Sequence, residues 1–78
     1  MTDEQYQNRL SLEGDFAMRR IAERAKHETR HDAFTRGTYW GEWGVVRDNM
    51  NPSRELASAA GDAIDRLAKL ARAEERGS

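Results

Sequence analysis

The regular spacing of apolar residues in the last third of the sequence constrains the fold more than any other feature. Between residues 56 and 70 the apolar side chains recur at alternating intervals of four and three, at Leu56, Ala60, Ala63, Leu67 and Leu70. A helix with 3.6 residues per turn places such positions on one side, as in a heptad seam. The pattern predicts a long helix over about residues 52–75 that buries this seam.

Two residues indicate where this helix starts. Asn51 is a favourable N-cap, because its side chain can accept a hydrogen bond from a free backbone N–H of the first turn. Pro52 suits the first helical position, where its missing N–H is not needed. We therefore expect Asn51 to cap the helix.

A second long helix is predicted over about residues 3–33. Residues 2–5 (TDEQ) form a capping-box pattern, and an apolar stripe at helical spacing follows, made of Tyr6, Leu10, Gly14, Ala17, Met18, Ile21, Ala22 and Ala25. Gly14 interrupts the stripe, as a kink, a break before a new N-cap at Asp15, or a close helix contact. Leu12, Phe16 and Phe34 lie off the stripe, which implies a second contact surface.

The aromatic segment at about residues 38–50 has two interpretations. As a helix, it places Tyr39, Trp43, Val46 and Met50 at intervals of four, three and four. As a hairpin, it would use Gly41 and Glu42 as a type II′ turn. Apolar and polar residues alternate poorly here, and an isolated hairpin is marginal in water. We favour the helix, despite the glycines within it.

These elements predict an all-α protein with a single domain over residues 1–78, either a small helical hairpin or a three-helix bundle. We expect the C-terminal helix to run antiparallel to the first. A chain of 78 residues builds only a marginal core. Because the sequence has no cysteine, disulfide bonds cannot stabilise it. Dimerisation is the remaining way to complete the core.

Charge and hydropathy exclude several classes of function. Thirteen basic and fourteen acidic residues give a net charge of −1, so nucleic acid is not an expected partner. No apolar run approaches the roughly 20 residues that span a bilayer, and the N-terminus does not resemble a signal peptide. We expect a cytoplasmic protein without a membrane partner. A nucleic-acid-binding helical protein, using Arg19, Arg20, Arg24 and Arg30, is kept as an alternative.

Residues 27–31 read HETRH and match the H-E-x-x-H pattern. In zinc-dependent metallopeptidases this pattern puts two imidazoles and a general base on one helical turn, but the resemblance covers five of 78 residues. Lys26 and Arg30 add positive charge, and neither a third ligand nor a substrate cleft is indicated. We predict no catalytic residue, no cofactor and no small-molecule substrate, with His27 and His31 as an alternative divalent-metal site.

The remaining hypothesis is a small non-enzymatic protein–protein interaction module. It would be an adaptor or an inhibitor, for example a phage or mobile-element protein that blocks a larger host protein, and it would bind that protein, a second copy, or both. Tyr39, Trp40 and Trp43 are expected to fill space between the two long helices, or to form a binding edge, because aromatic residues are frequent at interface hot spots. The apolar seam is wider than one partner helix covers. The predicted partner-binding residues are Tyr39, Trp40, Trp43, Leu56, Ala60, Ala63, Leu67 and Leu70.

Overall fold

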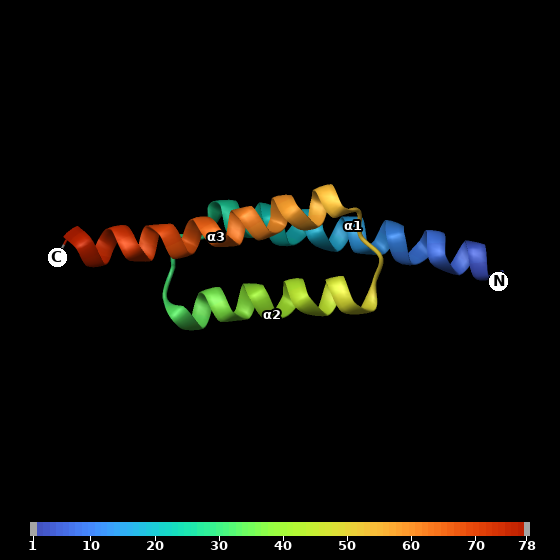
Figure 1. Cartoon of the computed structure of the whole chain (residues 1–78), viewed down its shortest axis with the longest axis horizontal. Helices are drawn as coiled ribbons and strands as arrows, with labels where there is room; N and C mark the ends of the chain where they lie inside the picture. Colours follow the sequence, from blue (N-terminus) through green and yellow to red (C-terminus); the bar gives the residue numbers. More distant parts are fainter. Residues whose placement is uncertain (1, 78) are drawn as a thin grey trace.

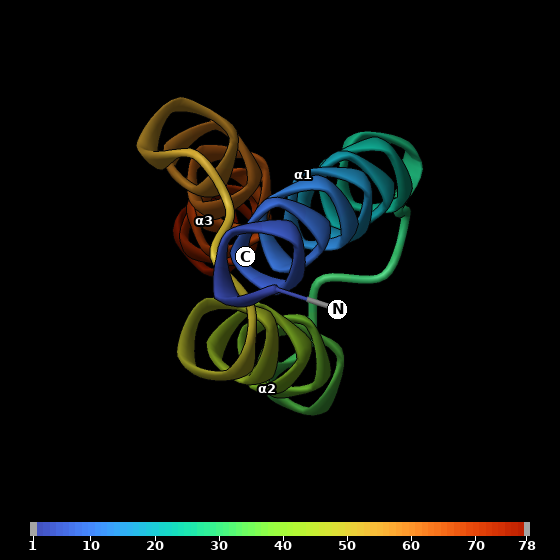
Figure 2. The same ribbon diagram turned by 90° about the vertical axis from the view of Figure 1, so that its right-hand side faces the viewer.

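The computed structural model describes residues 2–77, and these residues form three α-helices (Figure 1). α1 spans Asp3–His27, α2 spans Ala33–Asn49 and α3 spans Arg54–Gly77. Figure 2 looks along the bundle and shows the helices at the corners of a triangle. The all-α prediction is confirmed. The hairpin interpretation of residues 38–50 is wrong, because residues 38–49 lie within α2 and Met50 is its C-cap.

α3 runs parallel to α1, so the antiparallel orientation expected from the sequence is wrong (Figure 1). The backbone N–H of Ser53 donates to Asp15 Oδ1 over 2.7 Å, and Arg66 Nη2 donates to the carbonyl of Ala25 over 2.7 Å. These contacts advance in the same direction along both helices. The physical reason is that the middle segment is a full helix of 17 residues: the connection before α2 reverses the chain once, and the loop after α2 reverses it again.

The core is formed by nine buried side chains to which every helix contributes. They are Met18, Ile21, Ala25, Tyr39, Val46, Ala60, Ala63, Ile64 and Leu67. Met18, Ile64 and Leu67 are the largest that are fully buried. Burial of one such side chain stabilises a fold by about 1.5–3 kcal/mol, so this small core depends on a few residues.

The helix starts show which capping predictions were correct. The capping box of α1 is confirmed, because Gln5 N–H donates to Thr2 Oγ1 and Thr2 N–H donates to Gln5 Oε1. Asn51 as the cap of α3 is wrong, since α3 begins three residues later and the side-chain Nδ2 of Asn51 donates to Ser11 Oγ on α1 over 3.3 Å. Ser53 instead accepts from Leu56 N–H over 3.3 Å, and α3 begins at Arg54.

Gly14 marks a close contact, one of the three explanations that the sequence left open. α1 continues through Gly14 without a break, and Gly14 is buried. A Cβ atom added there would lie 2.8 Å from the backbone nitrogen of Pro52 and 3.0 Å from its Cδ. Only glycine lets the α2–α3 loop approach α1 this closely.

The helices are staggered along the bundle, which measures 57 × 18 × 16 Å. The first turns of α1 project beyond the other helices at one end, and the last turns of α3 project at the other (Figure 1). Tyr6 and Leu70 are exposed, at 52% and 39%, although both belong to predicted apolar stripes. Within residues 2–77, no helix combines the length and apolar character needed to cross a membrane.

We predict that Gly14→Ala destabilises the chain. Its methyl group would collide with the backbone of Pro52, and overpacking of this kind costs about 1–3 kcal/mol. Urea denaturation measures the change. Gly61→Ala is the matched control, because its Cβ would lie 3.7 Å from Trp40 at ordinary contact distance, and a gain of up to about 1 kcal/mol is expected. Equal gains for both variants would contradict a tight contact at Gly14.

Candidate functional site

The HETRH segment does not form a helical turn. α1 ends at His27, and Glu28 is its C-cap with extended backbone angles (φ −71°, ψ 128°). The sequence predicted a helix to about residue 33, so this boundary is wrong. The remaining residues of the motif belong to the connection that leads to Asp32, the N-cap of α2.

Glu28 explains why α1 ends here. Its Oε2 accepts hydrogen bonds from the backbone N–H groups of Thr29 and Arg30, over 3.0 and 3.2 Å. Its Oε1 accepts from the hydroxyl of Tyr39 on α2, over 3.0 Å. A carboxylate that binds these backbone groups offers the chain an alternative to helical hydrogen bonds. These bonds hold the pKa of Glu28 below its ordinary value. The hydrogen bond from the backbone N–H of Arg30 contributes most to this lowering.

Arg66 closes the end of α1 from the opposite side. Its Nη2 donates to the backbone carbonyls of Ala25, Lys26 and Glu28, over 2.7, 3.1 and 3.2 Å. The last carbonyls of a helix have no partner within the helix and favour a positive charge. One guanidinium group on α3 therefore caps α1 and joins the two parallel helices.

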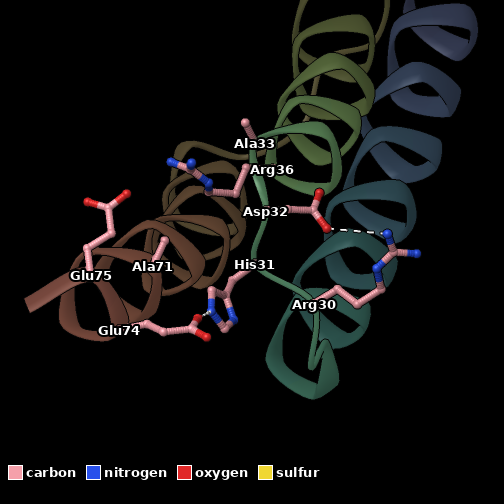
Figure 3. Close-up of a pocket in the computed structure, with 8 residues that line it drawn as sticks. All are labelled: Arg30, His31, Asp32, Ala33, Arg36, Ala71, Glu74 and Glu75. Atoms are coloured by element: carbon pink, nitrogen blue, oxygen red, sulfur yellow. Dashed lines mark hydrogen bonds and ion pairs between the residues drawn. The ribbon is translucent and has the colours of Figure 1, made fainter. Parts of the chain in front are cut away.

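The two histidines of the motif bind different carboxylates. His27 Nε2 lies 3.0 Å from Glu23 Oε1, one turn back on α1, and both side chains are exposed. His31 forms a hydrogen bond with Glu74 near the end of α3, and this bond is the main cause that raises the pKa of His31. Figure 3 shows His31 directed toward Glu74.

His31 and Glu74 line an open pocket of about 550 Å³ at this end of the bundle (Figure 3). Its remaining lining residues are Arg30, Asp32, Ala33, Arg36, Ala71 and Glu75. Within residues 2–77, no group of three or more His, Cys, Asp or Glu side chains could hold a metal ion. The helical-turn geometry that the metal alternative requires is also absent, because His31 lies outside α1.

The four arginines of the nucleic-acid alternative do not form a uniform basic ridge. Arg24 pairs with Glu42 of α2 over 3.0 Å, and its guanidinium carbon lies 5.4 Å from the ring centroid of Tyr39. Arg30 pairs with Asp32 over 3.3 Å. Arg19 and Arg20 are exposed on α1. Two of the four charges are thus neutralised by nearby carboxylates.

Most of the predicted partner-binding residues lie in the hydrophobic core or pack against it. Tyr39, Ala60, Ala63 and Leu67 are buried in the core, out of reach of a protein that docks on the folded chain. Leu56 is half-buried and packs against this core.

The two tryptophans lie where α2 meets α3. Trp43 is half-buried, and its Nε1 donates to the carbonyl of Ala57 over 2.9 Å. Trp40 meets the ring of Trp43 edge to face, with centroids 5.5 Å apart. Of the eight predicted residues, only Trp40 and Leu70 are exposed, at 40% and 39%.

The sequence analysis missed the side of α2 that faces away from the core. Here Phe34, Gly37, Gly41, Gly44 and Asp48 recur at intervals of three, four, three and four. At 100° per residue this line lies opposite the buried Tyr39 and Val46. Trp40 and Val45 flank the line. We call these seven residues the outer face of α2.

Apolar and small residues dominate the outer face of α2. Phe34 is 81% exposed and Val45 is 60% exposed. A Cβ atom added at Gly37, Gly41 or Gly44 would meet nothing within 4 Å, so packing within the chain does not require these glycines. Each costs about 0.8–1 kcal/mol relative to alanine in a helix interior. Their three-four spacing was the signal that could have revealed this face.

No protein family, no curated protein and no solved structure matches this chain. The function is therefore inferred from the chemistry of its own surface.

We predict that Arg66→Met destabilises the fold by about 1.5–3 kcal/mol, the usual contribution of hydrogen bonds to a charged group. The reason is that the carbonyls at the end of α1 would lose their donor. Chemical denaturation measures the change. Arg72→Met, at an exposed position on the same helix, should stay within about 0.5 kcal/mol of the wild type. Equal effects of the two variants would show that the cap is unimportant.

We predict that Glu74→Gln lowers the pKa of His31 toward its ordinary value of 6.5. A raised pKa in the folded state means that the pair stabilises the fold below pH 6.5 and that this contribution is lost as the pH rises through the folded pKa. NMR titration of the imidazole protons measures the shift. Glu75→Gln, which alters another carboxylate of the pocket, should leave the pKa raised. An unchanged titration in Glu74→Gln would disprove the contact.

Proposed function

We propose that the chain is a small non-enzymatic interaction module of the adaptor or inhibitor type, and that it binds an apolar helix of a partner protein on the outer face of α2. The observation that carries this proposal is the position of Phe34. This ring is 81% exposed and stands at one end of a line of three glycines, at each of which an added Cβ atom would meet nothing within 4 Å. An apolar ring and an accessible helix backbone together suit a helix that packs closely.

The energetics support a docked helix. Phe34, Trp40 and Val45 expose apolar area that a partner would remove from water, at about 25 cal/mol for each Å². The glycines weaken α2, yet they let the backbone of another helix approach. A helix that covers this face would bury the exposed apolar area, and the glycines would allow the close approach that this contact requires.

A neighbouring groove extends the surface toward α1. It has a volume of about 450 Å³, with Gly41 and Val45 on its α2 wall and Ala17 and Ile21 on its α1 wall. Arg24 and Glu42 also line it, and these two side chains form an ion pair. Arg20 lines the same groove, so its α1 wall adds one positive charge beside the apolar side chains.

The polar residues of the HETRH segment support a non-enzymatic role. Glu28 holds two backbone N–H groups and the hydroxyl of Tyr39, so the carboxylate expected of a general base is engaged in structure. His27 and His31 bind separate carboxylates. The segment positions the helices that present the outer face of α2.

We predict that Phe34→Ser reduces partner capture at least about tenfold, as expected for one interface hot spot. The tagged chain is purified from an extract of its source cells, and co-purifying protein, including untagged copies of the chain, is quantified by mass spectrometry. Leu12→Ser is the matched control, because Leu12 is 60% exposed on α1. The Leu12→Ser variant should capture as much partner protein as the wild type. If both variants capture equal amounts, the outer face of α2 is not the docking surface.

A further inference from the structure

We infer that a pocket between the end of α2 and the start of α3 binds an acidic peptide segment in which two carboxylates flank an apolar side chain. We call it the Trp43 pocket. It lies apart from the outer face of α2, so this inference goes beyond the proposed function. Its volume is about 450 Å³, within the range of ligand sites. Its lining includes Trp43, Arg47, Met50, Pro52, Arg54 and Ala57.

The charged groups that line the Trp43 pocket are all positive. They are the guanidinium groups of Arg47 on α2 and Arg54 on α3, and no carboxylate of residues 2–77 lines the pocket with them. The two pockets described above differ in this respect. Glu74 lines the pocket beside His31, and Glu42 lines the groove between α1 and α2. A site with only cations on its walls is complementary to an anionic ligand.

The indole of Trp43 holds one of these cations in place. Its Nε1 donates to the carbonyl of Ala57 over 2.9 Å, which fixes the ring between α2 and α3. The guanidinium carbon of Arg47 lies 5.0 Å from the centroid of this ring, at the distance of a cation–π contact. The positive charge is therefore positioned before a ligand arrives, and preorganisation of this kind lowers the entropy cost of binding.

The ion pair of Arg47 with Asp48 leaves donors for a ligand. Asp48 Oδ1 accepts from Arg47 Nε over 3.1 Å, and both side chains are more than half exposed. An exposed pair of this kind contributes little to stability, and a guanidinium group has five N–H donors. The remaining N–H groups of Arg47 can bind a carboxylate of another molecule.

Arg54 supplies the second cation. Its side chain is exposed on the first turn of α3, and it forms no ion pair within residues 2–77. The two arginines belong to different walls, and the loop that joins these walls supplies the apolar side chains of Met50 and Pro52. A ligand that meets both walls therefore needs two anionic groups with an apolar group between them. A small inorganic anion would leave the apolar lining in contact with water.

The test titrates the full chain with a capped tripeptide of two glutamates around one leucine. NMR follows the indole N–H of Trp43, and Trp40→Phe identifies this signal because the chain has two tryptophans. We expect the signal to shift to saturation, and the affinity to fall as salt is added, because salt screens exposed charges. The tripeptide with glutamines in place of the glutamates should leave the signal unchanged. Equal binding of the two tripeptides, or no binding of either, overturns the inference.

Arg54→Gln should raise the Kd of the glutamate tripeptide about threefold to fivefold, the usual contribution of an exposed ion pair. The matched control is Arg72→Gln, at an exposed position further along α3, which should bind like the wild type. The inference is wrong if both variants bind as tightly as the wild type.

Charge reversal separates the charge of the pocket from its shape. The double variant Arg47→Glu and Arg54→Glu should lose the glutamate tripeptide and bind the analogue with two lysines around leucine. Circular dichroism checks that the variant keeps its helices. A helical variant that still prefers the glutamate tripeptide contradicts the proposed contacts.

Inorganic phosphate is the competing ligand. If it shifts the signal of Trp43 at lower concentration than the glutamate tripeptide does, the pocket is a site for small anions and the inference is overturned.

The inference and the proposed function can fail separately. Phe34 does not line the Trp43 pocket, so Phe34→Ser should bind the glutamate tripeptide like the wild type. A loss of tripeptide binding in Phe34→Ser would place the peptide elsewhere and overturn the inference. If the wild type does not bind the tripeptide but Phe34→Ser loses a captured protein, only the proposed function stands.

Discussion

The end of α1 at His27 is the constraint on which the rest of the structure depends. The carboxylate of Glu28 takes the next two backbone N–H groups, and Arg66 takes three carbonyls at the same point. Because the helix ends there, Asp32 can start α2 and the chain can reverse. If α1 continued to residue 33, the first turn of α2 could not form, and Tyr39 would lose its position beside Glu28.

The second reversal depends on backbone proximity. Pro52 lies against Gly14, Asn51 binds the carbonyl of Leu10, and Ser53 N–H binds Asp15. These contacts fix the start of α3 beside the middle of α1, and they also produce the stagger of the two parallel helices. Nine buried side chains then suffice as a core, because both ends of α2 are held by specific polar contacts.

The surface follows from the same arrangement. The triangle of helices in Figure 2 buries one side of α2, and on the other side Phe34, Gly37 and Gly41 are exposed while Gly44 is half-buried. Large apolar side chains elsewhere, such as Phe16 and Leu12 on α1, are exposed without such a line beside them. Exposed apolar residues are ordinary on protein surfaces, whereas three unexplained glycines in one helix are not. This combination makes α2 the docking candidate.

The sequence by itself determined the helical class, the capping box of α1 and the seam from Leu56 to Leu67, because these features depend on local spacing and on side chains close in sequence. It did not determine the end of α1, the direction of α3 or the contact of Tyr39 with Glu28. Those depend on Arg66, Glu28 and Pro52 meeting groups that are distant in sequence. The outer face of α2 could be recognised only in the tertiary structure. The three glycines can be assigned to a solvent-facing side only when the opposite side of α2 is known to be buried.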